Sequence, residues 1–258
     1  MLLQPLPALT DNLIWILRTG PGAAALVVDP GDAAPVLAAG DAGLRPAAIL
    51  LTHHHPDHVA GVAALLQRWP DVEVIAPVED RIAHADRRVG DGDVTEMAGV
   101  TLRVIGVPGH TRSHVAFVTE GPEAPVLFCG DALFSLGCGR MFEGTPAQMH
   151  ASLQRLAGLP DATRVCCGHE YTLANARFAL AVEPRNDALH AHRADAQAAI
   201  DAGRCSLPST IGRERAANPF LRVETPTVRL AVAARLGRDP ADAIETFAVL
   251  RAWKDGFA

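Results

Sequence analysis

The chain has 258 residues, of which 49% are hydrophobic, and it carries a formal net charge of −6 at pH 7. This length suffices for one large domain or for a main domain with a smaller companion. The acidic balance argues against nucleic acid as the main partner, because phosphate binding needs an excess of basic side chains. No apolar run approaches the roughly 20 residues of a membrane span, and the first five residues lack the pattern of a signal peptide.

The first two-thirds of the chain alternate short apolar runs of strand length with turns. Leu13–Leu17 and Ala24–Val28 are predicted to form a hairpin through Gly20-Pro21-Gly22. Further strands are predicted at Ile49–Leu51, Val72–Ile75, Thr101–Ile105, Val115–Thr119, Val126–Cys129 and Arg164–Cys166, and helices at Ala33–Ala39, Val59–Trp69 and Pro146–Ala157.

From about Tyr171 the pattern becomes helical and rich in Ala, Leu and Arg. Helices are predicted at Asn175–Val182, Asp187–Ala202, Thr227–Leu236 and Pro240–Lys254, the last capped by Asp239. Strands with a few helices, followed by helices only, indicate an α+β domain over residues 1–170 and a helical domain over 171–258.

Five cysteines occur at irregular spacing and without a C-x-x-C pair: Cys129, Cys138, Cys166, Cys167 and Cys205. Such a set does not suggest a disulfide framework or a thiolate zinc site. We expect free thiols in a cytoplasmic protein, most of them packed as small core residues.

The segment Thr52-His53-His54-His55-Pro56-Asp57-His58 is a candidate metal site. Imidazole and carboxylate are the side chains that bind zinc and its first-row neighbours. The segment lies between a predicted strand and a predicted helix, where a rigid scaffold can orient side chains. We expect His54 to point away from its neighbours, because successive residues of an extended segment face opposite sides.

Three more candidate ligands, His110, Asp131 and His169, each follow a predicted strand and a glycine. Glycine lets the backbone turn sharply beside a crowded site. If these strands lie side by side, the ligands meet at one edge. Asp29 also ends a strand and is interpreted as a turn residue or a support for the ligands, and His114 as structural or supporting.

Seven candidate ligands are too many for one catalytic zinc, which usually takes three protein ligands. They suit two ions, with Asp131 able to bridge them and a bridging hydroxide as the nucleophile. Two alternatives remain open, namely a solvated histidine-rich loop and a metal site without catalysis.

The motif Thr-His-His-His-Pro-Asp-His, followed by His110, Asp131 and His169, resembles the H-x-H-x-D-H pattern of the metallo-β-lactamase superfamily. The resemblance implies an αββα sandwich with metals at one edge. It further implies that His53, His55 and His110 bind one metal, that Asp57, His58 and His169 bind the other, and that Asp131 bridges them.

Other segments are similar to the glyoxalase II family, the hydroxyacylglutathione hydrolases. They are Gly137-Cys138-Gly139-Arg140-Met141-Phe142-Glu143-Gly144-Thr145, Cys167–Thr172 with Asn175–Phe178, Asn218–Arg222 and Arg251–Asp255. The resemblance covers nearly the whole chain. It implies hydrolysis of S-D-lactoylglutathione to D-lactate and glutathione, the second step of methylglyoxal detoxification. Our mechanistic hypothesis is that Asp57 orients the nucleophile or accepts its proton.

Glutathione is an anionic tripeptide, so its site needs cationic donors and an aromatic hydroxyl. By resemblance, Arg140, Tyr171, Arg251 and Lys254 bind it, and Arg251 and Lys254 share one face of the last helix. Phe142 stands where some family members have a tyrosine, and the lost hydrogen bond is worth about 0.5–1.5 kcal/mol. A lone arginine or lysine is more often a solvated charge.

Rival functions are a one-iron glutathione-persulfide dioxygenase, a lactonase or other thioesterase of the superfamily, and a non-catalytic metal-binding module. The ligands accept zinc, iron or manganese, with zinc as our expectation. We expect a monomer acting on a small-molecule thioester. The sequence leaves open the acyl preference and whether another small thiol replaces glutathione.

Overall fold

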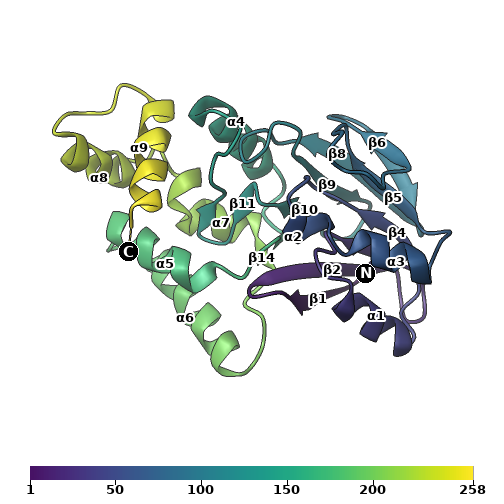
Figure 1. The fold of residues 1–258 in the computed structure, drawn as a ribbon. Helices are drawn as coiled ribbons and strands as arrows, with labels where there is room; N and C mark the ends of the chain where they lie inside the picture. The colour runs from purple at the N-terminus through teal and green to yellow at the C-terminus, as the bar shows by residue number, and fades with distance from the viewer. Residues whose placement is uncertain (258) are drawn as a thin grey trace. The chain divides into compact units, whose positions relative to one another are not determined.

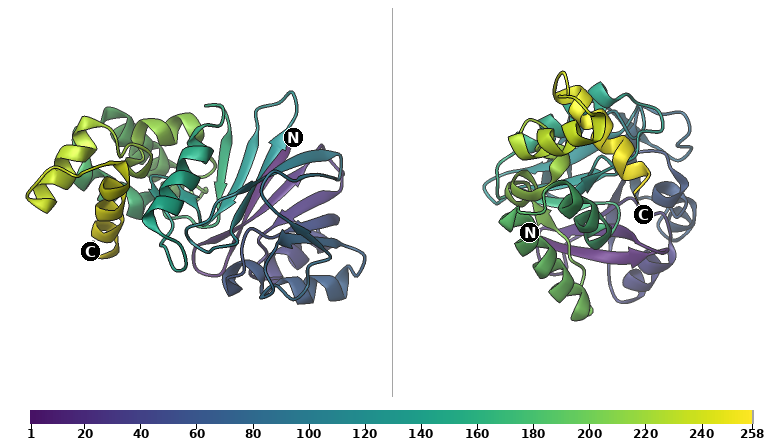
Figure 2. Two further views of the ribbon diagram at one scale, coloured as in Figure 1. Left: turned by 90° about the horizontal axis from the view of Figure 1, so that it is seen from above. Right: turned by 90° about the vertical axis from the view of Figure 1, so that its left-hand side faces the viewer.

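The computed structural model describes residues 1–257, which divide into two compact units (Figures 1 and 2). The first unit comprises Met1–Gly106, Ser113–Gly130 and Cys166–Glu170. The second comprises Val107–Arg112, Asp131–Val165 and the described residues from Tyr171 onward. The division into an α+β domain over residues 1–170 and a helical domain over residues 171–258 remains a prediction from the sequence.

The first unit contains most of the strands. These elements are β1 (Leu2–Ala8), β2 (Asn12–Arg18), β3 (Ala25–Val28), α1 (Ala34–Asp41), β4 (Pro46–Leu50), α2 (Pro56–Val59), α3 (Val62–Arg68), β5 (Glu73–Pro77), β6 (Arg87–Val89), β7 (Val94–Met97), β8 (Val100–Gly106), β9 (Val115–Glu120) and β10 (Val126–Gly130).

One sheet of the first unit has the order β1-β2-β3-β4-β5-β6. The strands β1, β2 and β3 are antiparallel, whereas β3 to β6 are parallel. The predicted hairpin is confirmed, with Leu17 opposite Leu26. Strand β1 was not predicted because Pro5 and Pro7 interrupt its apolar pattern, and it lies at the edge of the sheet, where proline is tolerated.

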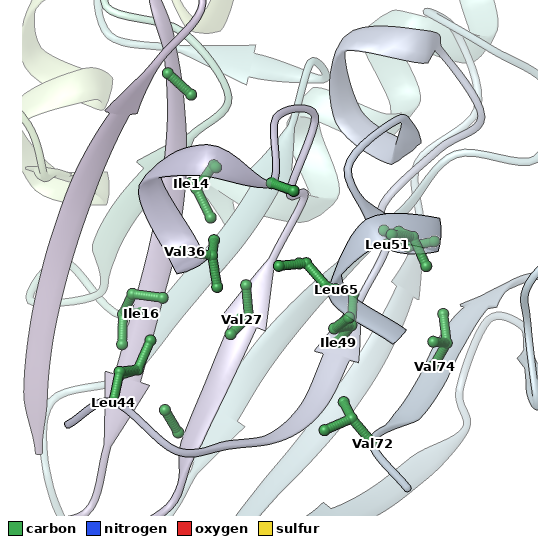
Figure 3. Close-up of a cluster of buried hydrophobic side chains, with 14 of the residues drawn as sticks. Ile14, Ile16, Val27, Val36, Leu44, Ile49, Leu51, Leu65, Val72 and Val74 are labelled. Carbon is green, nitrogen blue, oxygen red and sulfur yellow. The ribbon is translucent and has the colours of Figure 1, made fainter. Parts of the chain in front are cut away.

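The core of this unit lies between that sheet and its helices. Figure 3 shows Val36 of α1 and Leu65 of α3 directed toward Val27 and Ile49 of the strands. These side chains are almost fully buried. Burying a Val or Leu side chain contributes about 1.5–3 kcal/mol, so this cluster anchors the loops that follow the strands.

The predicted helix Val59–Trp69 is wrong in its boundaries, because α2 and α3 are separate. Gly61 lies between them and its amide donates to Pro30 O at 2.9 Å. A Cβ at Gly61 would lie 2.4 Å from that carbonyl oxygen. This close approach to the chain after β3 ends α2 after one turn.

A second sheet includes the order β13-β10-β9-β8-β7. Its strand β13 (Arg164–Cys167) crosses the boundary, since Arg164 and Val165 pair with β14 in the second unit. The remaining elements of the second unit are β11 (Leu133–Phe134), β12 (Gly137–Cys138), α4 (Pro146–Ala157), α5 (Thr172–Val182), α6 (Asp187–Asp201), β14 (Ser209–Thr210), α7 (Ile211–Ala217), η1 (Pro219–Leu221), α8 (Pro226–Leu236) and α9 (Ala243–Asp255).

The predicted helical C-terminal region is confirmed, and Figure 2 shows its last helices in green and yellow. The predicted start of the last helix at Pro240 is wrong. Helix α9 begins at Ala243, and Asp242 caps it by accepting a hydrogen bond from Glu245 N at 2.8 Å. No described helix is long and apolar enough to cross a membrane.

Candidate metal centre and its surroundings

Asp57, His58 and His169 form a group of potential metal ligands within the first unit. The Asp57 Oδ2 atom lies 3.6 Å from His58 Nε2 and 3.4 Å from His169 Nε2. Both imidazoles are buried, whereas the Asp57 side chain is 39% exposed. The group is thus closed on the histidine side and accessible on the carboxylate side.

The backbone after β4 explains how the motif presents these groups. His55 has an extended conformation with φ −63° and ψ 143°, and Pro56 occupies the first turn of α2. Proline fits this position because its missing N–H needs no partner there. A Cβ at Gly31 would lie 1.7 Å from Asp57 O, so the chain after β3 can pass here only as glycine.

Within each group of candidate ligands, neighbouring donor atoms are as far apart as two ligands of the same metal ion. Tetrahedral zinc with bonds of about 2.0–2.1 Å separates neighbouring nitrogen ligands by about 3.3 Å. The His53 Nε2 and His55 Nδ1 atoms are 3.1 Å apart, close to the 3.4 and 3.6 Å of the first group. Nitrogen and carboxylate donors at this spacing fit a divalent metal.

Carboxylates hold the far side of two of these rings. His58 Nδ1 lies 3.1 Å from Asp29 Oδ2, and His169 Nδ1 lies 2.7 Å from Asp11 Oδ1. Asp29 also accepts hydrogen bonds from the amide and hydroxyl of Thr52. Such partners fix the orientation and tautomer of a ligating histidine, so Asp29 supports the ligands, as expected.

The other histidines of this unit differ in their surroundings. The rings of His53 and His114 are stacked, with centroids 4.6 Å apart and an interplanar angle of 15°. His54 Nδ1 instead lies 3.8 Å from Glu79 Oε2. His114 therefore packs against a candidate ligand, whereas His54 belongs to a neighbouring ion pair.

Sequence reasoning missed Asp11 and Asn12. Asn12 Nδ2 donates to Asp57 O and Oδ2, both at 3.1 Å, and Asn12 forms an isolated bridge with His169. Aspartate and asparagine between two apolar runs usually indicate a turn. Only the pairing of residues far apart in the chain reveals their role.

His110 and Asp131 lie together in the second unit. His110 Nε2 is 3.5 Å from Asp131 Oδ2, and His110 Nδ1 is 2.8 Å from Arg140 O. A Cβ at Gly139 would lie 2.0 Å from Asp131 O. The glycine therefore permits a close turn, and the Arg140 carbonyl holds the His110 ring.

A cationic group in the second unit comprises Arg140, Arg177, Arg251 and Lys254. Burial, followed by the charges of Arg251, Arg177 and Arg140, lowers the pKa of Lys254, and Asp255 opposes this effect. The Arg140 side chain is 65% exposed and its Nε lies 3.5 Å from Asp255 Oδ1. The excess of positive charge suits an anionic ligand.

Arg251 is buried, and its guanidinium is held by hydrogen bonds within the second unit. Its Nη1 donates to Cys138 O at 2.7 Å, and its Nη2 donates to Asp255 Oδ1 at 3.0 Å. The guanidinium lies 5.2 Å from the centre of the Phe220 ring. Arg251 therefore stabilises the fold of this unit as well as contributing charge.

The two aromatic candidates also lie in the second unit. The ring of Phe142 is 64% exposed and meets His110 edge to face, with centroids 5.3 Å apart. The ring of Tyr171 meets Phe134 in the same way at 5.2 Å. Phe142 thus provides an apolar surface beside His110.

Two family models match the chain. The metallo-beta-lactamase superfamily model matches residues 10–169, and the model for the hydroxyacylglutathione hydrolase C-terminus matches residues 170–257. A relative from Xylella fastidiosa (strain M12), hydroxyacylglutathione hydrolase, is 54% identical over 257 residues, covering 100% of this chain and 98% of its own.

Solved structures agree with the fold. The BLEG-1 B3 metallo-beta-lactamase matches with a TM-score of 0.65 at 24% identity, over 85% of this chain and 99% of its own. TTHA1623 in a di-iron-bound form is 33% identical, with a TM-score of 0.51, over 66% of this chain and 92% of its own. The predicted metallo-β-lactamase-like α+β fold with a helical C-terminal domain is confirmed. The chain belongs to the metallo-β-lactamase superfamily and, within it, to the hydroxyacylglutathione hydrolase family.

Proposed function

We propose that the chain hydrolyses the thioester S-(2-hydroxyacyl)glutathione, chiefly S-D-lactoylglutathione, to D-lactate and glutathione. The observation that carries the proposal is the full-length match to a hydroxyacylglutathione hydrolase, which includes the helical C-terminal region. The metal-ligand group and the cationic group provide the two kinds of chemistry that this reaction needs.

We assign His53, His55 and His110 to one metal, Asp57, His58 and His169 to the other, and Asp131 to both. Chain connectivity supports the inclusion of the two residues from the second unit. Asp131 is bonded to Gly130 at the end of β10, and the segment Val107–Arg112 is joined at both ends to the first unit.

When bound, two divalent metals supply Lewis acidity and a nucleophile from water at neutral pH. Asn12 holds the Asp57 carboxylate, which we assign to orient the nucleophile or accept its proton. Thiolate is a good leaving group, so the chain needs no strong general acid. Zinc is the metal that we propose, and the di-iron state of TTHA1623 makes iron its rival.

We assign the carboxylates of glutathione to Lys254, Arg140 and Arg251, with Tyr171 as a hydroxyl donor and Phe142 as an apolar wall. Glutathione carries two carboxylates, and the second unit concentrates cations around Lys254. Because Arg251 is almost fully buried, we assign it a second role besides binding, which is to raise the local positive potential and to orient its neighbours.

We further propose that the protein acts as a monomer in the cytoplasm. None of the five cysteines forms a disulfide within the described residues, and four of them are buried. Cysteines outside disulfides are typical of a reducing compartment.

Purified protein should hydrolyse S-D-lactoylglutathione, measured as loss of thioester absorbance, with metal analysis of the same sample. A panel of glutathione thioesters and thioesters of other small thiols would define the acyl and thiol preference. No hydrolysis by a metal-loaded sample would refute the proposal. One iron per chain together with oxygen uptake would support the persulfide dioxygenase instead.

A further inference from the structure

The short hairpin of β11 and β12 ends in a two-residue turn, Ser135-Leu136, that is completely buried. Leu136 has φ +58°, a left-handed conformation that is costly for a leucine. Buried backbone groups also need hydrogen-bond partners. The surrounding structure must therefore hold this turn in place.

Three side chains bind four of the polar backbone groups around the turn. Asn218 Nδ2 donates to Phe134 O at 3.1 Å and to Gly137 O at 2.9 Å. Asn175 Nδ2 donates to Ser135 O at 3.0 Å. The amide of Leu136 donates to Glu214 Oε2 at 2.8 Å.

Glu214 of α7 is the centre of this arrangement. It is fully buried and accepts hydrogen bonds from the Ser209 hydroxyl and from Asn218 Nδ2 as well as from the turn. It therefore holds the turn directly and orients the asparagine that holds the other two carbonyls.

Ser135, His192 and Glu214 lie in the order of a serine–histidine–acid catalytic triad, but they are not catalytic. Ser135 Oγ is 3.2 Å from His192 Nε2, and His192 Nδ1 is 4.0 Å from Glu214 Oε1. Ser135 is only 1% exposed, so a substrate carbonyl cannot reach its hydroxyl. The three residues belong to the support of the turn.

The hairpin connects this support to the candidate ligands of the second unit. Asp131 precedes β11, and Ala132 O accepts from Gly139 N at 3.2 Å, closing the hairpin. Beyond Gly139, the Arg140 carbonyl lies 2.8 Å from His110 Nδ1. A shift of the turn therefore moves both the segment that carries Asp131 and the partner of His110.

We infer that Glu214, together with Asn218 and Asn175, is a positioning residue for the metal centre. It fixes the Leu133–Cys138 hairpin, which in turn sets the His110 ring and the Asp131 carboxylate for the metal. The inference rests on the metal assignment of the proposed function and not on the identity of the substrate.

The test compares Glu214→Gln with Thr210→Ala in the metal-loaded full chain. Thr210 caps the same helix by accepting a hydrogen bond from Arg213 N at 3.3 Å, whereas the turn is bound by Glu214, Asn175 and Asn218. The measurements are metal content per chain and the rate of zinc transfer to a chromophoric chelator. Because outer partners of ligands contribute 10–100-fold to metal affinity, Glu214→Gln should lose zinc about 10-fold faster than wild type, and Thr210→Ala at the wild-type rate.

Equal zinc loss from Glu214→Gln, Thr210→Ala and wild type would overturn the inference. If Glu214→Gln does not fold, Asn175→Ala decides alone. It removes one bond to the turn, so faster zinc loss supports the inference and a wild-type rate overturns it. A wild-type protein that binds zinc but leaves S-D-lactoylglutathione intact would refute the proposed function without affecting this test.

Discussion

The ligand group of the first unit and the cationic group of the second unit are built differently. In the first unit, His58 and His169 are buried, and a carboxylate from another element holds the far nitrogen of each ring. In the second unit, Lys254 is half-buried and Arg140 is exposed. The first arrangement suits an ion with strict geometry, and the second suits a flexible anionic ligand. Rigidity is concentrated where coordination requires it.

The largest expected effect comes from removing a ligand. His58→Ala should lower metal content and reduce hydrolysis by more than about 100-fold, the upper range for loss of an outer partner. The matched control is His54→Ala, because His54 faces Glu79. Metal content and kcat/KM are the measurements, and equal metal loss in both variants would contradict the assignment.

The second-largest effect on metal affinity is expected for the carboxylates that hold the histidine rings, Asp29 and Asp11. Asp29→Asn should reduce metal affinity by about 10–100-fold, since buried Asp29 holds both Thr52 and His58. Asp11→Asn should have a smaller effect, because the Asp11 side chain is 37% exposed and water can replace it. Competition with a chelator measures both, and the reverse order would show that burial does not determine the effect.

In the second unit, Lys254→Ala and Arg251→Ala should differ in their effects on thermal stability. Lys254→Ala should raise KM for glutathione thioesters about 10-fold with kcat unchanged, since a charged hydrogen bond is worth about 1.5–3 kcal/mol. Arg251→Ala should also lower Tm, because it removes the donor to Cys138 O. Exposed Arg193→Ala is the control. An unchanged Tm for Arg251→Ala would contradict the structural role of that residue.

A smaller effect is expected for the ion pair beside His54. Hydrogen bonding to Arg81, with help from Ser113, lowers the pKa of Glu79 to about 2. This stabilisation is present above the unfolded pKa near 4.5 and is lost as pH falls toward 2. With Arg81 half-exposed, we expect about 1–2 kcal/mol. Glu79→Gln should lower Tm at pH 7 and not at pH 2, and a constant difference would refute the linkage.

The smallest effect is expected for Phe142→Tyr. The ring is exposed beside His110, and one added hydrogen bond is worth about 0.5–1.5 kcal/mol. KM for S-D-lactoylglutathione should therefore fall about 2- to 10-fold with kcat unchanged. Phe142→Leu is the control, because it keeps an apolar side chain without adding a hydroxyl. A higher KM for Phe142→Tyr than for wild type would exclude a hydrogen bond from the new hydroxyl to the substrate.

The apolar runs were sufficient to predict most strands of the first unit, and the glycine before His169 indicated that this residue is a candidate ligand. Its grouping with Asp57 and His58 followed from the family resemblance, and the structure brings these three side chains together. The sequence did not reveal Asp11 and Asn12, because their role depends on a bridge to His169 far along the chain. It also did not reveal that Arg251 is buried, since helical spacing places it on a face without saying what packs there. Long-range pairing and packing of polar groups are what the local pattern omits.

The late position of His169 has a consequence for biosynthesis. The first unit is built from residues up to Gly130 and from Cys166–Glu170, so all of residues 131–165 leave the ribosome before its last piece does. Trp15 is translated early, but its Nε1 donates to Cys167 O, a partner that is translated 152 residues later. The nascent first unit must therefore wait with an open sheet edge, and exposed edges invite aggregation. We therefore expect the nascent chain to be prone to aggregation until Cys166–Glu170 has been translated and β13 can pair with β10.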